Sequence, residues 1–289
     1  MHPLVRALFS AWEWRPDVFF VLTTLAVVYA VGWMRLRRQS VHRKLATRGR
    51  LIAYMSGLAT LALSLMSPID RLGSQLFFMH MIQHMLIIQL AAPLLLLGNP
   101  FPFMLWALPQ APRLQTARLF TDESAFRRLL TAATRPGVAW LVFLTVYLGW
   151  HDTAAYNAAL TYKWVHNLQH ITFLGASLLY WWPIVGNAPH FHRRLPNWGK
   201  LAYLLGVIPP NMLVGVSIAF APEVMYTYYL SVPRIWGFSA LQDQQLAGAI
   251  MWIQGSEMYI WVALYILYHM FRKKDPSRSV TPAGAVKSP

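Results

Sequence analysis

The chain has 289 residues, of which 56% are apolar and only 12% are charged, with 13 Trp, 13 Met and no Cys. This composition is typical of a polytopic membrane protein, and the lack of Cys excludes disulfides, thiolate metal sites and a lipoprotein anchor. The net charge of +15 would suit a nucleic-acid-binding protein, but the positions of the charges exclude that partner, as shown below. The N-terminus lacks the pattern of a cleavable signal peptide.

Seven apolar runs along the chain predict membrane-spanning helices. A bilayer core is crossed by roughly 17–25 apolar residues, and only the fourth run is shorter than that. The runs are Val18–Met34, Leu51–Ser67, Leu76–Leu97, Gly137–Trp150, Val165–Val185, Leu201–Phe220 and Leu246–Phe271. The predicted fold is therefore all-α, with a single seven-helix transmembrane domain over residues 1–274.

The basic residues predict the orientation of these spans. Most of the 25 Lys and Arg lie in the connections after the first, third, fifth and last spans. By the positive-inside rule those connections are cytoplasmic, which places the N-terminus outside and the C-terminus inside a bacterial inner membrane. The polar, Pro- and Ser-rich residues 275–289 are expected to form a disordered cytoplasmic tail. The net charge thus reflects topology and an affinity for anionic lipid, with no nucleic acid involved.

Two histidine pairs open the third and fifth predicted spans. The first copy reads His80-Met-Ile-Gln-His84 and the second reads His166-Asn-Leu-Gln-His170. Residues four apart lie on one face of a helix. Both spans run from outside to inside, so the four histidines are predicted at one depth, on the periplasmic side.

The likeness of the two copies extends beyond the histidines. Each apolar run ends in a similar stop, Gly98-Asn99-Pro100 in the first copy and Gly186-Asn187-Ala188-Pro189 in the second. Because the copies run in the same direction, the pattern predicts a parallel repeat of helical hairpins, spans three–four and five–six.

Further polar and thioether side chains are predicted at the same depth. His151 ends span four, Asp243 begins span seven, and Met251 follows about two turns deeper. Met85 directly follows His84. The complete set of predicted metal ligands is His80, His84, His166, His170, His151, Met85, Met251 and Asp243.

Imidazole and thioether ligands without thiolate favour copper, although imidazoles alone also accept zinc, iron or haem. A ligating imidazole needs a hydrogen-bond partner that fixes its tautomer. Gln83, Gln169, Asp152 and Asp243 are candidates for that task. Three alternatives stay open: a haem-binding electron carrier, a copper transporter, and a scaffold whose polar side chains only join helices. Phosphate loops, nucleophile elbows and HExxH motifs are lacking, so an enzyme is not expected.

Other features have simpler interpretations. Tyr and Trp near the helix ends, Tyr156, Tyr226 and Tyr229 among them, are most simply anchors at the membrane interface. Pro209-Pro210 predicts a kink in span six. Glu257 is a membrane-embedded acid within span seven.

Three segments, FFMHMIQHMLIIQLAAPLLLLGNP, WHDTAAYNAAL with the following VHNLQH, and LQDQQLAGAIMW, resemble the CtaG family of caa-type cytochrome c oxidase assembly factors. The resemblance covers about residues 15–270. It implies an inner-membrane protein that helps to mature a haem-copper oxidase by handling copper. The implied partners are an oxidase subunit or a periplasmic copper chaperone, with a homo-oligomer as a further possibility. By motif, the resemblance carries over to His80, His84, His151, His166 and His170, and to Asp243, Gln244 and Met251.

Overall fold

The computed structural model describes residues 12–39, 43–121, 123–186, 188–189 and 191–272, and the regular structure of these residues is entirely helical. The predicted tail 275–289 and Asn187 of the second stop lie outside the described residues. The helices are α2 (Pro16–Arg38), α3 (Arg48–Met66), α4 (Pro68–Gly73), α5 (Phe77–Met85), the π-helix η2 (Leu86–Ala91), α6 (Ala92–Leu97), α7 (Pro100–Ala107), α8 (Gln110–Arg118), α9 (Ala125–Ala133), α10 (Pro136–Trp150), α11 (Thr153–Thr161), α12 (Lys163–Val185), α13 (Asn197–Leu205), α14 (Ile208–Ala219), α15 (Tyr228–Ser231) and α16 (Ala240–Arg272).

Five helical segments are long and apolar enough to cross a membrane: Pro16–Arg38, Arg48–Met66, Phe77–Leu97, Asn197–Ala219 and Ala240–Arg272. A sixth is obtained if α9 and α10, which are bent by 69° relative to each other, count as one broken span. The chain is therefore a multi-pass membrane protein.

All seven predicted runs fall on helices, but two of them lack the length or the hydropathy of a simple span. The helix α10 has only 15 residues. The helix α12 has 23 residues, but its first two turns carry His166, Asn167, Gln169 and His170, which lower its mean hydropathy. Five or six spans are supported, and the seven-span topology stays a prediction.

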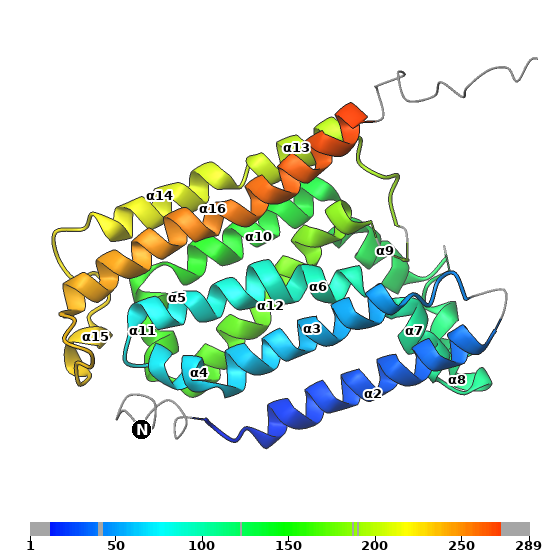
Figure 1. Ribbon diagram of the computed structural model, residues 1–289, viewed down its shortest axis with the longest axis horizontal. Helices are drawn as coiled ribbons and strands as arrows, with labels where there is room; N and C mark the ends of the chain where they lie inside the picture. Colours follow the sequence, from blue (N-terminus) through cyan, green and yellow to red (C-terminus); the bar gives the residue numbers. More distant parts are fainter. Residues whose placement is uncertain (1–11, 40–42, 122, 187, 190, 273–289) are drawn as a thin grey trace, which may run out of the picture.

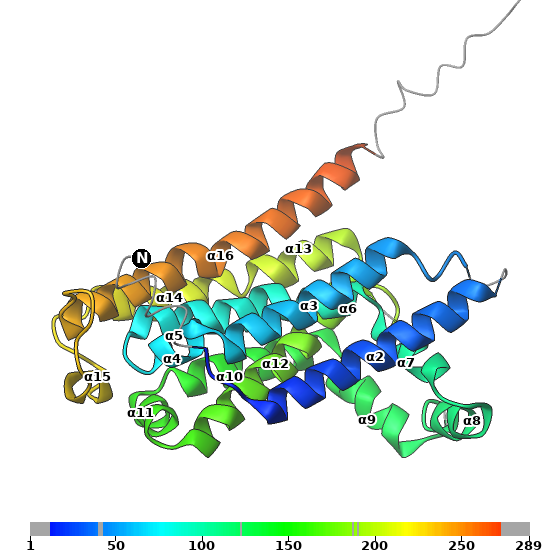
Figure 2. The ribbon, with the colours of Figure 1, turned by 60° about the horizontal axis from the view of Figure 1, so that its bottom comes forward.

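The long helices lie side by side along the length of the molecule, with α12 close to α5 and α6 (Figures 1 and 2). The larger hydrophobic core includes Phe173, Tyr180 and Trp181 of α12 and joins them to α5, α10, α14 and α16. A smaller core lies between α2, α3, η2 and α7. Its centre is Tyr29, whose ring stacks on Tyr54 at 3.9 Å and whose hydroxyl donates to the Gly98 carbonyl at 2.7 Å.

The helices α14 and α16 approach each other closely because small residues face one another. A Cβ atom at Gly248 would lie 2.4 Å from the backbone nitrogen of Ala219, and one at Gly215 would lie 2.7 Å from that of Trp252. Only glycine permits this backbone contact, which is a common way of packing membrane helices. The break between α13 and α14 falls at Gly206 and Val207, just before Pro209, where the sequence predicts a kink.

The π-helix η2 follows from the sequence. Pro93 has no N–H group, and the N–H of Ala92 donates to the Ile87 carbonyl, so the Ile88 carbonyl loses both of its neighbouring helical donors. The indole Nε1–H of Trp181, on α12, donates to that carbonyl at 3.1 Å. Gln89 reaches the other way and donates to the Gly255 carbonyl of α16 at 2.7 Å. The irregular turn thus binds α5 and α6 to both neighbouring helices.

The two predicted stops meet at the far ends of α6 and α12. Asn99, with a left-handed φ of 49°, accepts a hydrogen bond from the backbone N–H of Ala188 at 3.1 Å. The helices α5–α6 and α12 therefore run in parallel, in contact from the histidines to the stops. That they are copies of one ancestral hairpin stays a prediction.

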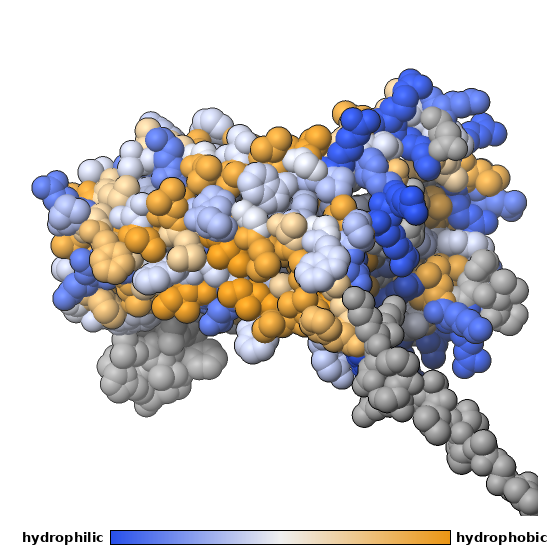
Figure 3. Space-filling view, turned by 90° about the horizontal axis from the view of Figure 1, so that it is seen from above, coloured by the Kyte–Doolittle hydropathy of each residue, from blue (hydrophilic) through white to orange (hydrophobic). Residues whose placement is uncertain are grey.

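Charge is concentrated at the end of the bundle that carries the stops. Figure 3 shows the most hydrophilic side chains gathered at one end, while apolar side chains cover much of the remaining length on this face. The last turn of α2 contributes Arg35, Arg37 and Arg38. Arg35 donates to the Ala107 carbonyl at 2.7 Å, where it satisfies the C-terminus of α7. This asymmetry agrees with the predicted cytoplasmic end, and the orientation itself stays a prediction.

Candidate metal centre

The first turn of α5 is fixed by a carboxylate from a distant helix. Asp243 of α16 is fully buried and accepts from the backbone N–H groups of Phe77 at 2.9 Å and Phe78 at 3.0 Å. Its charge suits the positive end of the α5 dipole. Arg234 forms an ion pair with the same carboxylate at 2.9 Å. The helix that carries His80 and His84 therefore has a defined start.

Four imidazole rings from α5 and α12 converge at this end of the bundle. The ring centroids are 4.3 Å apart for His80 and His84 and 4.2 Å apart for His166 and His170, as expected for residues four apart. Across the two helices, His80 lies 5.1 Å from His166, and His84 lies 5.4 Å from His170. His80, His84 and His170 each offer a ring nitrogen within 4.8 Å of the others.

The ring nitrogens of this cluster are buried and largely without partners. His80 is fully buried, and the exposed fractions of His84 and His170 are 2% and 5%. Five of their nitrogens have no hydrogen-bond partner among the described residues: Nε2 of His80 and both ring nitrogens of His84 and of His170. Buried polar atoms without partners are rare and call for an explanation such as a bound ion. The donor set and its spacing fit a metal held by three or four imidazoles.

Tyrosine hydroxyls hold His80 in position. The Tyr156 oxygen lies 2.9 Å from His80 Nδ1, and the Tyr229 hydroxyl lies 3.4 Å from the same atom while donating to the Gly73 carbonyl at 2.9 Å. When Nδ1–H donates to Tyr156, the lone pair of His80 is on Nε2, the nitrogen without a partner. Burial raises the pKa of Tyr156 well above 10, so the phenol stays neutral.

This arrangement corrects the interpretation of these tyrosines as interface anchors. Tyr156, Tyr226 and Tyr229 are almost completely buried, and their rings surround Phe77 at centroid distances of 4.8 to 5.5 Å. An anchor at the membrane interface would keep its hydroxyl in water.

Three of the four predicted orienting residues have other partners, and an orienting role for the buried Gln169 stays a prediction. Gln83 donates to the Ser64 carbonyl at 2.7 Å and to Asp70 Oδ1 at 2.5 Å, so it joins α5 to α3 and α4. Asp152 caps α11 by accepting from the N–H groups of Ala154 and Ala155. Asp243, as described above, uses both oxygens on α5 and Arg234. We therefore leave Asp243 out of the candidate metal centre, because its oxygens are already engaged.

The remaining predicted ligands are His151, Met85 and Met251, and none of them belongs to the two described groups of candidate ligands. His151 is half-buried, its Nδ1 contacts the Tyr147 carbonyl at 2.6 Å, and burial lowers its pKa to about 4. Its ring and that of His84 share Phe173 as a neighbour, at 6.4 and 4.7 Å. Met85 and Met251 are buried in the larger core. Coordination by His151, Met85 or Met251 stays a prediction.

Asp70 is a further candidate ligand that no motif in the sequence singled out. This carboxylate, on the short helix α4, has an oxygen within 4.8 Å of ring nitrogens of His166 and His170. Burial raises the pKa of Asp70, and the hydrogen bond from Gln83 acts against that shift. The available signal in the sequence is its place at the outer end of the second span, level with the histidines.

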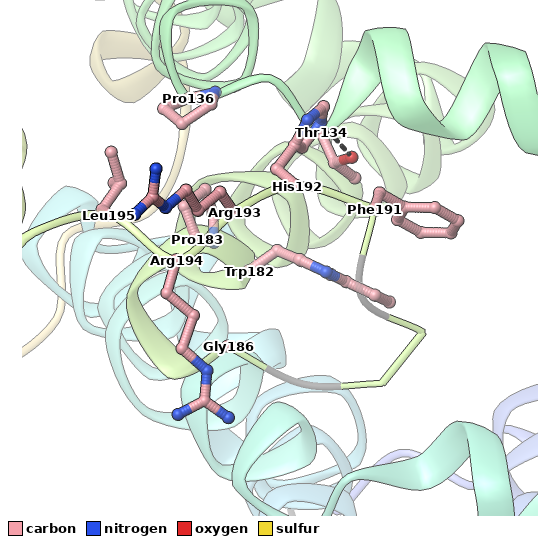
Figure 4. Close-up of a pocket in the computed structure, with 10 residues that line it drawn as sticks. All are labelled: Thr134, Pro136, Trp182, Pro183, Gly186, Phe191, His192, Arg193, Arg194 and Leu195. Atoms are coloured by element: carbon pink, nitrogen blue, oxygen red, sulfur yellow. Dashed lines mark hydrogen bonds between the residues drawn. The ribbon is translucent and has the colours of Figure 1, made fainter.

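A small pocket lies at the end of the bundle opposite the histidine cluster. It is about 40 Å³ in volume, and Figure 4 shows Thr134, His192 and Arg194 among its lining residues. His192 is held there by the Thr131 carbonyl at 2.7 Å and by Thr134 at 3.2 Å. None of the predicted metal ligands lines this pocket.

An all-helical membrane bundle that holds a buried histidine cluster at one end defines this chain as a polytopic membrane protein with a candidate metal centre. The family described as the cytochrome c oxidase caa3 assembly factor (Caa3_CtaG) matches residues 27–273, and the chain belongs to that family.

The chain is also similar to three uncharacterized mycobacterial proteins. It is 30% identical over 276 residues to one from Mycobacterium bovis and one from Mycobacterium tuberculosis, and 25% identical over 282 residues to one from Mycobacterium leprae. These matches cover 94% of this chain but only 41% of each relative, so the chain spans less than half of their length. No solved structure matches the chain.

Proposed function

We propose that this protein binds copper within the cluster of His80, His84, His166 and His170 and supports metal delivery to a haem-copper oxidase. The observation that carries the proposal is a set of five buried imidazole nitrogens, on helices that converge from distant parts of the sequence, for which the described part of the chain offers no hydrogen-bond partner. Because the chain belongs to a family of cytochrome c oxidase assembly factors, an oxidase is the proposed recipient of the metal. In this proposal the site faces the periplasm, and the metal passes to an oxidase subunit or to a periplasmic chaperone.

Copper is favoured over other metals by chemistry. A chain without Cys offers no thiolate, and sites of imidazole bind Cu²⁺ more tightly than the other divalent first-row metals. The buried Met85 and Met251 would add thioether ligands that suit the reduced ion. Zinc is the main competitor, since imidazoles accept it in tetrahedral geometry.

A haem fits the site less well. His84 and His170 lie against each other and Phe173, so a porphyrin would have to separate α5 from α12. The cavity beside the cluster is about 250 Å³, below the usual size of pockets that hold organic ligands. Transport across the membrane is also less favoured, because the described His-containing metal groups lie at one end of the bundle.

The test is metal analysis of the full chain purified in detergent or nanodiscs. Wild type is expected to retain copper after a chelator wash and to show no Soret band. The His80→Ala/His84→Ala variant should lose the retained ion. The matched control is His269→Ala, which removes a histidine that packs on Tyr265 and Tyr268 near the other end of α16. Equal, negligible copper in wild type and the double variant would overturn the proposal, and a Soret band would favour the haem alternative.

A further inference from the structure

A charged cavity opens beside the histidine cluster. This vestibule has a volume of about 250 Å³ and is lined by residues of the segment before α2, of α4 and of the α11–α12 region. Its polar lining includes Glu13, Arg15, Asp70, Lys163, His166 and Asn167. Of the four clustered histidines, only His166 lines it.

Two candidate metal positions overlap at the inner wall of the vestibule. The outer position consists of Asp70, His166 and His170, and the inner position consists of His80, His84 and His170. His170 belongs to both. Asp70 and His166 line the vestibule, whereas the inner residues are buried among core side chains such as Phe173.

Three of the neighbouring charges of the vestibule have partners of their own. Lys163 lies 3.5 Å from Glu13, and Arg15 donates to Asp17 at 2.9 Å and to Asn167 at 3.2 Å. Asp70 accepts from Gln83, which is uncharged. The carboxylate at the outer position is thus held by a neutral amide, with its negative charge close to His166 and His170.

The two positions differ in the chemistry that they offer. A carboxylate with two imidazoles, next to a polar cavity, accepts a cation that keeps part of its water shell. The inner position offers three neutral imidazoles in a dry environment, where an incoming cation has to lose its water. A cation that entered the inner position directly would have to shed its shell in one step.

We propose that Asp70, His166 and His170 form a loading position, from which a hydrated divalent cation moves into the inner position. The inference rests on the proposed function and assigns the entry route of the same site. In the move, the cation exchanges Asp70 and His166 for His80 and His84 and keeps His170. No electron is transferred, and the water released passes to the vestibule.

The experiment compares the rate and the extent of Cu²⁺ uptake by the full chain in nanodiscs, using rapid mixing and a chelator quench. In Asp70→Asn, the side-chain oxygen can still accept from Gln83, so the local fold is conserved. We expect this variant to load at least tenfold more slowly than wild type, with one tightly held ion retained at equilibrium. The matched control is Glu13→Gln, which alters another carboxylate of the vestibule and should load as wild type does.

A second variant tests the loading position at another residue, so that a folding defect in Asp70→Asn cannot decide the result. His166→Asn removes the other ligand that is exclusive to the loading position and should slow uptake to a similar extent. In the His80→Ala/His84→Ala variant, the remaining weak Cu²⁺ should show an electron paramagnetic resonance spectrum of mixed oxygen and nitrogen ligands.

The outcomes separate the two proposals. If wild type binds no copper, the proposed function fails and the loading position with it. If wild type binds copper but Asp70→Asn and His166→Asn load at its rate, the loading position is overturned while the metal centre stands. If Glu13→Gln slows loading as much as Asp70→Asn does, general attraction by the vestibule replaces the specific position.

Discussion

Replacing Tyr156 with phenylalanine isolates the contribution of one hydroxyl to the metal centre. The Tyr156 ring is fully buried and packs on Phe77 at 5.2 Å and on Tyr226 at 4.4 Å, and phenylalanine keeps those contacts. The change removes the 2.9 Å hydrogen bond to His80 Nδ1. His80 then loses the partner that fixes its tautomer and the direction of Nε2.

The expected loss follows from this geometry. Removing the partner of a ligating histidine typically weakens metal binding 10- to 100-fold, which corresponds to about 1.4–2.8 kcal/mol. The stability of the metal-free protein should fall by only about 1 kcal/mol, the usual net value of one hydrogen bond. The Tyr229 hydroxyl, 3.4 Å from the same nitrogen, can compensate in part, so Tyr156→Phe/Tyr229→Phe should lose more than the single variant.

Copper affinity is measured by titration against a competing chelator, with thermal unfolding recorded on the same samples. The matched control is Tyr180→Phe, a fully buried tyrosine of α12 whose hydroxyl donates to the Tyr203 carbonyl, away from the cluster. The reasoning is refuted if Tyr156→Phe and the double variant fold normally and bind copper as tightly as Tyr180→Phe does.

Two further predictions concern the fold that positions the site. Asp243→Asn removes the charge that caps α5 and pairs with Arg234. We expect thermal unfolding to show a loss of about 1–3 kcal/mol in stability, while the variant still retains one copper per chain. Loss of copper from a fully folded variant would restore Asp243 as a ligand. Gly248→Ala places a methyl group 2.4 Å from the Ala219 nitrogen and should destabilise the α14–α16 contact by about 1–3 kcal/mol. The control Gly175→Ala, where nothing lies within 4 Å of the added atom, should be neutral or stabilising; equal unfolding temperatures for the two variants would contradict the close packing.

The sequence was most informative where periodicity and charge carried the signal. The His80–His84 and His166–His170 spacing predicted one helical face each, and the parallel direction of the two spans predicted that the faces meet. Both expectations depend on helix geometry alone, which is local and regular. The segments α5–α6 and α12 also end together at Asn99 and Ala188, as the two stops suggested.

The parts that were missed depend on tertiary packing. Asp243 is a titratable residue at the predicted depth, but its oxygens point to the N–H groups of α5, and no pattern in the sequence encodes that direction. Tyr156 lies in a short helix outside the predicted spans, so its contact with His80 depends on how α11 folds back. Asp70 reaches His166 and His170 from α4, and its hydrogen bond with Gln83 depends on how α3 and α5 pack against α4.

The π-helix η2 also lets one helix satisfy two sets of contacts that a regular α-helix would couple. Its six residues, Leu86–Ala91, form a wider turn than an α-helix does and so accommodate an extra residue between the histidines and the stop. Because the wide turn takes up that residue, the α-helical turns before and after it keep the faces that they would have without it. Removing one residue from Leu86–Ala91 should therefore leave His80 and His84 facing α12, but it should close the wide turn and weaken the hydrogen bond from Trp181 to the Ile88 carbonyl. A one-residue deletion in a regular part of α5 would instead turn the histidines by roughly 100° relative to the rest of the helix.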